Sequence, residues 1–169
     1  AHVAVVNAGI GGNAVVRGGL GPTALARFDR DVLSQPGVRW VLVSEGVNDI
    51  GTSRTDSSAA VAGELIAAFR DLATRAHARG LRVYMATIMP FGRSFYDNPQ
   101  HEAARQTVNR WVRTAHSFDA VIDFDAAMRD PDEPSRVLPA ADGGDHLHPN
   151  ELGYRLMANA VDLGLFRAQ

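Results

Sequence analysis

Four short apolar runs alternate along the chain with longer amphipathic segments, and this alternation limits the possible folds more than any other feature of the sequence. The apolar runs are residues 3–6, 38–44, 81–88 and 120–124. Apolar residues recur at helical spacing in the segments 23–33, 57–79, 102–118 and 149–163. Nearly continuous apolar strands are typical of a parallel sheet that is covered on both faces. The alternation therefore predicts an α/β fold in which a parallel sheet lies between two layers of helices.

The composition predicts one domain, over residues 1–169. With 46% hydrophobic residues the chain can build one core, and it contains no internal repeat. The net charge of −2 argues against a nucleic-acid partner, because phosphate-binding surfaces usually carry a basic excess. The absence of cysteine excludes disulfides, thiol catalysis and thiolate metal sites. No apolar run is long enough to span a membrane, and the first residues lack the basic region of a secretory signal.

Three polar clusters follow the strand-like runs or precede the last helical segment. They are NAGIGGN at residues 7–13, EGVNDIG at residues 45–51 and DGGDHLHP at residues 142–149. In open parallel sheets, ligands bind at the carboxyl ends of the strands. We therefore expect the three clusters to meet at one edge of the sheet.

The last cluster places an acid and an imidazole three residues apart, as Asp145 and His148, directly before Pro149. Proline suits the first turn of a helix, so one interpretation is a helix entry and nothing more. A second is an acid–base pair, in which Asp145 orients His148 as a general base. A third is a metal site built from carboxylates and imidazoles. Its candidate ligands are Asp142, Asp145, His146 and His148.

The middle cluster supplies Asn48, whose side-chain amide is suited to donate a hydrogen bond to a developing oxyanion. The alternative is a strand-to-helix turn in which Gly46 and Asn48 adopt unusual backbone angles. We expect Asp49 to hold this loop through hydrogen bonds. Glu45 ends a buried strand, so its charge needs a partner such as an arginine.

The first cluster is rich in glycine, but its spacing fits neither the dinucleotide-binding fingerprint nor the P-loop. The backbone N–H of Gly12 is a candidate second donor to the same oxyanion. The alternative is a tight turn that requires small residues.

The three clusters occur in the order of three sequence blocks of the SGNH (GDSL) hydrolase superfamily, which the chain resembles over residues 7–149. The resemblance assigns Gly12 and Asn48 to the oxyanion hole, and Asp145 and His148 to the catalytic triad. It implies a flavodoxin-like three-layer α/β/α sheet with strand order 2-1-3-4-5. It also implies ester hydrolysis or acyl transfer through a serine nucleophile and an acyl-enzyme, without a metal or organic cofactor.

The remaining block of that family, a GDS motif after the first strand, is absent from the sequence. The chain opens at what matches the second strand of the family. We therefore expect the strand with the serine to precede Ala1 and the chain to be N-terminally incomplete. The missing strand would lie between runs 3–6 and 38–44, so either another segment fills the gap or these two runs pair directly. Within the chain, Ser44 and Ser94 are the alternative nucleophiles.

The loops at residues 89–99 and 131–144 are expected to form the walls of the substrate site. Phe91, Phe95 and Tyr96 in the first loop would stack on a sugar or aryl group, or else pack the loop onto the sheet. The predicted activity is therefore hydrolysis of a carboxylic ester, such as an acetylated sugar, a short-chain or aryl ester, or a lipid.

The expected partners are this small-molecule or carbohydrate ester and an upstream segment of the same chain that completes the sheet. Since many relatives are exported, we expect a secreted protein. The alternative function is a non-catalytic domain that binds a carbohydrate or acyl ligand after losing its nucleophile.

Overall fold

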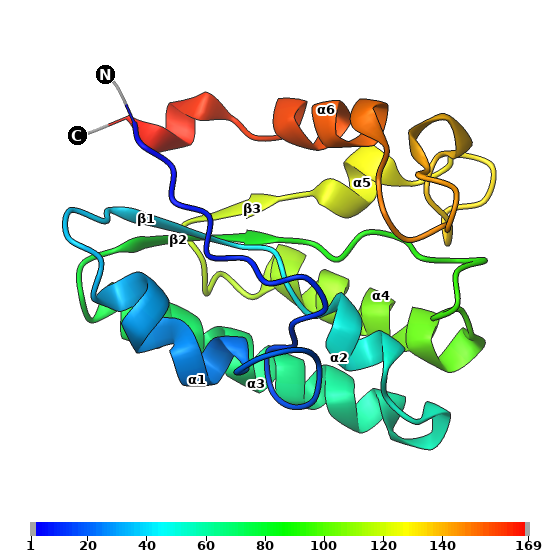
Figure 1. The fold of residues 1–169 in the computed structure, drawn as a ribbon, viewed down its shortest axis with the longest axis horizontal. Coiled ribbons are helices and arrows are strands. Elements are labelled where there is room, and N and C mark those ends of the chain that lie inside the picture. Colours follow the sequence, from blue (N-terminus) through cyan, green and yellow to red (C-terminus); the bar gives the residue numbers. More distant parts are fainter. Residues whose placement is uncertain (1–2, 168–169) are drawn as a thin grey trace.

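A computed structural model describes residues 3–167, and at its centre lies a sheet of three parallel strands (Figure 1). The strands are β1 (Trp40–Val43), β2 (Arg82–Ala86) and β3 (Ala120–Ile122). They lie side by side in the order of the chain, with β2 in the middle. Helices cover both faces, which confirms the predicted fold class. The complete family order 2-1-3-4-5 stays a prediction.

The helices on one face of the sheet pack against the largest of three hydrophobic cores. They are α1 (Ala24–Phe28), the π-helical turn η1 (Asp29–Leu33), α3 (Ser58–His77) and α4 (Pro99–Thr114). The apolar stripe of α3 places Leu65, Phe69 and Leu72 in this core, where all three are fully buried. Val83 and Met85 of β2 face the same core. The single helix predicted over residues 23–33 is thus divided into an α-helical and a π-helical turn.

The opposite face of the sheet carries a smaller core beneath the C-terminal part of the chain. The elements there are α5 (Phe124–Met128), α6 (Glu151–Asn159) and the 3-10 turn η4 (Leu163–Phe166). The ring of Phe166 stands edge-on to Trp40 and Tyr84, with centroid distances of 5.9 and 5.3 Å. Because Tyr84 and Ala86 face this core, β2 is buried on both sides, as its apolar sequence predicted.

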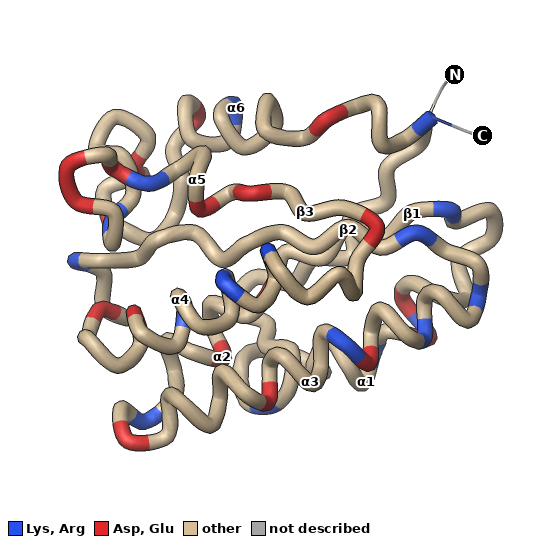
Figure 2. The backbone as a smooth tube through the Cα atoms, turned by 180° about the vertical axis from the view of Figure 1, so that it is seen from behind, with Lys and Arg blue, Asp and Glu red and all other residues tan. Residues whose placement is uncertain are grey.

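The strand predicted over residues 120–124 ends early because Asp123 caps the helix that follows. Its side chain accepts a hydrogen bond from the N–H of Ala126 and forms an ion pair with Arg113. Burial raises the pKa of Asp123, but these hydrogen bonds outweigh it and bring the pKa to about 2. Next to it, Arg105 and Asp125 form a buried ion pair with a 2.6 Å N–O distance. Elsewhere, basic and acidic positions are interspersed along the chain (Figure 2).

Several short helices were not predicted from the sequence. They include α2 (Val47–Gly51), α5 and the 3-10 turns η2 (Thr55–Ser57) and η3 (Pro139–Ala141). The turn from β1 into α2 depends on Gly46, which has φ +107°. A Cβ atom there would come within 3.2 Å of Ile88 and 3.3 Å of Phe69. Among the helices of residues 3–167, none combines the length and apolar character that a membrane crossing requires.

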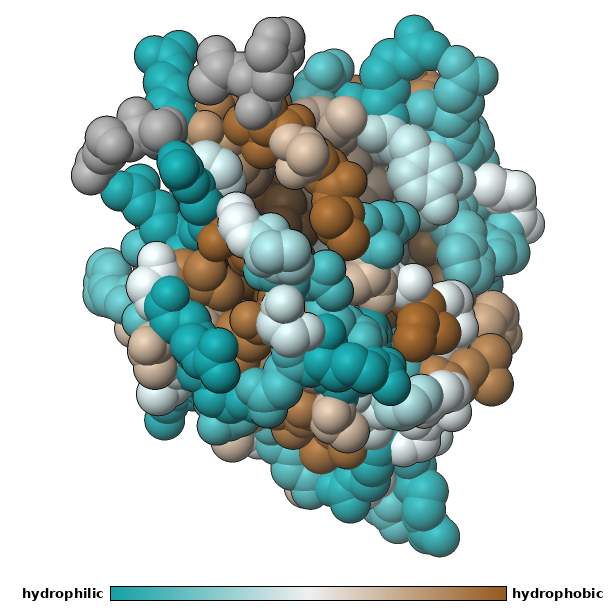
Figure 3. Space-filling model, turned by 60° about the vertical axis from the view of Figure 1, so that its left-hand side comes forward, coloured by the Kyte–Doolittle hydropathy of each residue, from teal (hydrophilic) through white to brown (hydrophobic). Residues whose placement is uncertain are grey.

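The strand predicted at residues 3–6 is wrong, since this segment forms neither a strand nor a ladder with residues 38–43. Val5 is 89% exposed and Val6 70% exposed. A β-branched run becomes a strand only where a neighbour supplies hydrogen bonds, and no described strand does so here. On the face of the molecule next to the chain ends, apolar side chains surround a hollow (Figure 3).

Candidate active site

A cavity of about 380 Å³ opens beside the carboxyl ends of β1 and β2. Gly12, Asn48 and His148 all line it, together with Phe95 and Tyr96. These five residues come from four separate stretches of the sequence. The structure therefore brings together residues from all three polar clusters, while the chemical role of each residue stays a prediction.

The loop that carries His148 is held by its own carboxylate. Asp145 accepts hydrogen bonds from the backbone N–H groups of His148 and Leu147 at 2.8 and 3.0 Å. Its other oxygen lies 2.7 Å from His148 Nδ1. These hydrogen bonds, led by the one from the His148 N–H, hold the pKa of Asp145 far below its ordinary value. Since the carboxylate is charged, Nδ1 carries the proton and Nε2 is the basic nitrogen.

A second pair of the same kind lies in the same loop. His146 Nδ1 is 2.5 Å from Asp142, whose other oxygen accepts the N–H groups of Gly144 and His146. Each histidine thus engages its own carboxylate. Over residues 3–167, no three histidine, aspartate or glutamate side chains are placed to share one metal ion. The geometry does not support the metal site predicted from Asp142, Asp145, His146 and His148.

Asn48 stands at the start of α2 with both ends of its amide engaged. Its Nδ2 donates to the backbone oxygen of Asn13 at 2.8 Å, and its Oδ1 accepts from the Tyr96 hydroxyl at 3.0 Å. An amide nitrogen carries two hydrogens, so one donor remains after the bond to Asn13. Asn48 can therefore hold a loop and still donate to a group in the cavity.

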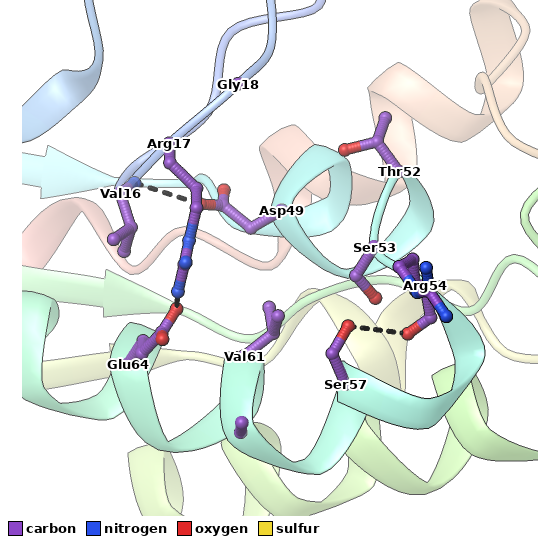
Figure 4. Close-up of a pocket in the computed structure, with 11 residues that line it drawn as sticks. Val16, Arg17, Gly18, Asp49, Thr52, Ser53, Arg54, Ser57, Val61 and Glu64 are labelled. Carbon is purple, nitrogen blue, oxygen red and sulfur yellow. Dashed lines mark hydrogen bonds and ion pairs between the residues drawn. The ribbon is translucent and has the colours of Figure 1, made fainter.

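The neighbouring residue, Asp49, faces the other side of α2 and is buried. Its two oxygens accept the N–H groups of Val15 and Val16 at 2.8 and 2.9 Å. Asp49 thus holds a loop through hydrogen bonds, but this is the loop after the glycine-rich cluster and not its own loop, as the sequence analysis expected. Figure 4 shows the contact between Asp49 and Val16 at the edge of a second cavity, of about 500 Å³, which Arg17 and Glu64 bridge as an ion pair.

The partner that Glu45 requires is Arg27, which the sequence analysis did not identify. Arg27 Nη2 lies 3.7 Å from Glu45 Oε1, and Glu45 also lines the first cavity. Burial raises the pKa of Glu45 to about 7; the charge of Arg27 opposes this shift and the charge of Asp49 adds to it. Glu45 is thus a carboxyl group that titrates near neutral pH.

Arg27 also holds the glycine-rich loop. Its guanidinium donates to Asn13 Oδ1 at 2.8 and 3.1 Å and to the backbone oxygen of Ala8 at 2.5 Å. Asn13 is fully buried, and its own amide donates to the backbone oxygens of Leu20 and Pro22. Arg27 also pairs with Asp31 four residues on, but its partners Asn13 and Ala8 lie 14 and 19 residues away, so no local pattern marks its contact with the glycine-rich loop.

This network fixes the position of Gly12. Gly12 has φ +72°, and a Cβ atom there would lie 2.9 Å from the side chain of Leu20. Its carbonyl accepts the N–H of Leu20 at 2.8 Å. Within residues 3–167 the N–H of Gly12 has no hydrogen-bond partner, so it is available to a ligand.

Several other predictions for the cavity need correction. Phe91 does not line it; the side chain is fully buried in the larger core, so it takes the packing alternative. The loop 131–144 forms no part of the wall, because Val137 and Ala141 anchor it in a small core of its own. Tyr154 and Met157 of α6 line the cavity instead and were not predicted.

The two internal serine candidates differ in position. Ser44 is exposed and lines the cavity. Ser94 does not line it, and its hydroxyl accepts the N–H of Tyr96 at 3.1 Å. Of the two, only Ser44 shares a cavity with His148.

Comparison with known proteins gives one family and a set of similar folds. The model of the GDSL-like lipase/acylhydrolase family matches residues 1–156. None of the curated proteins is similar enough in sequence to count as a match.

Three solved structures illustrate the likeness in fold. A GDSL-like lipase from Bacteroides thetaiotaomicron is 19% identical, with a TM-score of 0.63, over 80% of this chain and 65% of its own. An acetylxylan esterase from Geobacillus stearothermophilus is 22% identical, with a TM-score of 0.60, over 81% and 63%. The acetyl xylan esterase AlAXEase is 21% identical, with a TM-score of 0.65, over 90% and 76%. The chain thus spans slightly less than two thirds of the length of the first two structures.

Proposed function

The chain belongs to the GDSL-like lipase/acylhydrolase family, and we propose that it provides the acid, the base and two oxyanion donors of a carboxylic ester hydrolase. The observation that carries the proposal is the single cavity shared by Gly12, Asn48 and His148. These residues come from three distant stretches, and each brings a group that acyl transfer requires.

In this mechanism His148 Nε2 takes the proton of a serine hydroxyl as the serine attacks the ester carbonyl. The 2.7 Å contact between Asp145 and Nδ1 keeps Nε2 basic and stabilises the imidazolium that forms. His148 then gives the proton to the leaving alcohol. A water molecule, activated in the same way, hydrolyses the acyl-enzyme.

The negative charge that develops on the carbonyl oxygen is stabilised by the second hydrogen of Asn48 Nδ2 and by the N–H of Gly12. Both groups are fixed before the reaction, because Asn48 and Asn13 are joined by a 2.8 Å hydrogen bond. Donors that are already oriented need no reorganisation in the transition state. Removing one such donor raises the barrier by roughly 3 kcal/mol.

We propose a short acyl group, such as acetyl, on a sugar or another ring-shaped alcohol as the substrate. Two of the similar structures are acetylxylan esterases. In this protein, Phe95 and Tyr154 line the cavity and are 72% and 59% exposed. Exposed aromatic rings at the mouth of a cavity provide flat apolar surfaces for such an alcohol.

The nucleophile in this proposal is a serine that precedes residue 1, with Ser44 as the alternative. A fluorophosphonate probe forms a covalent bond with an activated serine. After incubation of the full-length natural protein with the probe, peptide mass spectrometry identifies the labelled residue. Label on a serine before residue 1 supports the proposal. Label on Ser44 transfers the role to that residue, and no labelled serine leaves a domain that binds the ester without hydrolysing it.

The proposed role of His148 is tested with His148→Ala in the full-length protein. We expect kcat for p-nitrophenyl acetate to fall by about 1,000-fold or more. The matched control is His77→Ala, since His77 also pairs with an aspartate, Asp119 at 2.9 Å, but lies outside the cavity. A kcat in His148→Ala that equals the control value would remove His148 from the mechanism.

A further inference from the structure

Tyr96 connects the loop after β2 to α2 through two contacts. Its hydroxyl donates to Asn48 Oδ1 at 3.0 Å. Its ring lies against Gly51, where a Cβ atom would come within 2.2 Å of the ring carbons. Residues 48 and 51 lie almost one turn apart on α2, so they form one face. Only glycine at position 51 allows the ring to lie close enough for the hydroxyl to reach Asn48.

The backbone of Tyr96 is held from the other side. His101, which is buried, has Nδ1 2.8 Å from the carbonyl oxygen of Tyr96. The hydroxyl of Ser94 accepts the N–H of Tyr96 at 3.1 Å. The backbone from which the Tyr96 side chain extends is therefore fixed, and the position of the phenol ring does not depend on a ligand.

Hydrogen bonds at both ends hold the Asn48 amide in one orientation. The carbonyl of Asn13 accepts only from the amide nitrogen, so a flipped amide would lose that bond, and Tyr96 would then accept from the amide instead of donating to it. Donation to Oδ1 also polarises the amide and strengthens its N–H groups as donors. Burial raises the pKa of Tyr96, which keeps the hydroxyl protonated and able to donate.

We propose that Tyr96 is a positioning residue that orients and polarises the Asn48 amide for the oxyanion, and that Gly51 is the residue that admits it. This inference rests on the proposed ester hydrolysis. It gives Tyr96 a task in the transition state, separate from contact with the substrate. Such a residue should change kcat and leave KM nearly unchanged, because the oxyanion forms only during the reaction.

The test compares two ways of breaking the contact in the full-length protein. Tyr96→Phe removes the hydroxyl and keeps the ring, and we expect kcat for p-nitrophenyl acetate to fall about 5- to 10-fold. Gly51→Ala keeps the hydroxyl but displaces the ring, and we expect a similar fall. Tyr84→Phe is the control, since the Tyr84 hydroxyl donates to the Leu165 carbonyl in the other core. That variant should keep the kcat of the wild-type protein.

Two further readouts separate positioning from other roles. In an Asn48→Ala background, Tyr96→Phe should cause no additional loss of kcat, because the residue on which it acts is gone. In the otherwise wild-type protein, Tyr96→Phe should shift and broaden the side-chain amide signals of Asn48 in a ¹⁵N-resolved NMR spectrum.

An increase in KM with unchanged kcat would show that Tyr96 contacts substrate, and an equal loss of kcat in the Asn48→Ala background would also overturn the inference. Unchanged Asn48 signals would overturn it even for an inactive protein. A wild-type protein that does not hydrolyse the ester, but whose Asn48 signals respond to Tyr96→Phe, contradicts the proposed function and leaves the positioning contact intact.

Discussion

Two loops meet at the cavity, and they are stabilised in opposite ways. The loop at residues 12–16 is held by side chains from other elements, such as Asp49, which binds backbone N–H groups 33 and 34 residues away. The loop at residues 142–149 is held by its own acids, Asp142 and Asp145, which bind groups two to four residues away. One loop is shaped by the whole fold, and the other largely by itself.

The two halves of the proposed site therefore depend on the rest of the molecule to different degrees. The groups proposed as oxyanion donors, Gly12 and Asn48, are placed only when α1, α2 and the glycine-rich loop are assembled, because Arg27 and Asp49 connect these elements. The Asp145–His148 pair requires only a short turn and its own hydrogen bonds. Damage to the fold should therefore affect the oxyanion donors first.

Among the variants that test this contrast between the loops, Asp49→Ala should have the largest effect, because it removes the remote support of the first loop. The change leaves the N–H groups of Val15 and Val16 without their partner, and Val15 is fully buried. Unsatisfied buried groups cost about 1–3 kcal/mol each, so we expect the free energy of unfolding to fall by about 2–4 kcal/mol. Because the Gly12 loop would also move, kcat should fall about 10- to 100-fold. Denaturant unfolding and initial rates measure the two quantities.

A matched control for this variant is Asp71→Ala, which removes an exposed aspartate that pairs with Arg75 on α3. Surface pairs of this kind contribute about 0–1 kcal/mol. If Asp49→Ala were no more destabilising than Asp71→Ala, the first loop would not depend on remote support, and the contrast between the loops would fail.

The same contrast explains what the sequence could predict. DGGDHLHP encodes both carboxylate–imidazole pairs within eight residues, so the pairing of Asp145 with His148 was predictable from spacing. The residue types in EGVNDIG predicted that Asp49 accepts hydrogen bonds, but not that its partners are Val15 and Val16, 34 and 33 residues away. The contact of Arg27 with Asn13 and Glu45 was not predictable, because it depends on how α1 packs. Local chemistry was visible in the sequence, whereas long-range partners were not.

The fold shows the same limit. The nearly continuous apolar runs that became β1, β2 and β3 were recognised because burial on the sheet requires them. The run at residues 3–6 has the same composition but is exposed, because a strand also needs a hydrogen-bonding neighbour. Likewise, Phe91 and Phe95 looked alike in the sequence, but one is fully buried and the other 72% exposed. Whether an aromatic residue in a loop faces the core or the cavity is a tertiary property.

A smaller effect is expected from Asp142→Ala, which removes local support from the second loop. Asp142 accepts hydrogen bonds from the backbone N–H groups of Gly144 and His146, and its other oxygen contacts Nδ1 of the His146 ring. The turn is close to solvent, so water can replace these bonds, and we expect a loss of about 1 kcal/mol in the free energy of unfolding. Amide hydrogen exchange should accelerate at residues 143–148 and remain unchanged at Val15 and Val16. Faster exchange at both loops would show that they form one cooperative unit, against the comparison above.

Glu45→Gln tests the remote network through its pH dependence. Burial raises the pKa of Glu45 from 4.5 to about 7, so the folded protein binds this proton more tightly than the unfolded chain. The stabilising contribution is complete below pH 4.5 and is lost as the pH rises through about 7. The wild-type protein should therefore lose stability over this interval, and Glu45→Gln should lose less.

At pH 8 we expect the variant to be more stable by about 1–2 kcal/mol, after allowance for solvent screening. Urea unfolding at pH 4.5, 6, 7 and 8 measures the difference, with Glu151→Gln, at a position 88% exposed on its side chain, as the control. Parallel pH profiles for wild type and Glu45→Gln would mean that the proton on Glu45 is not linked to the loop-holding network of Arg27, whereas converging profiles at low pH would tie that network to the titration of one carboxyl group.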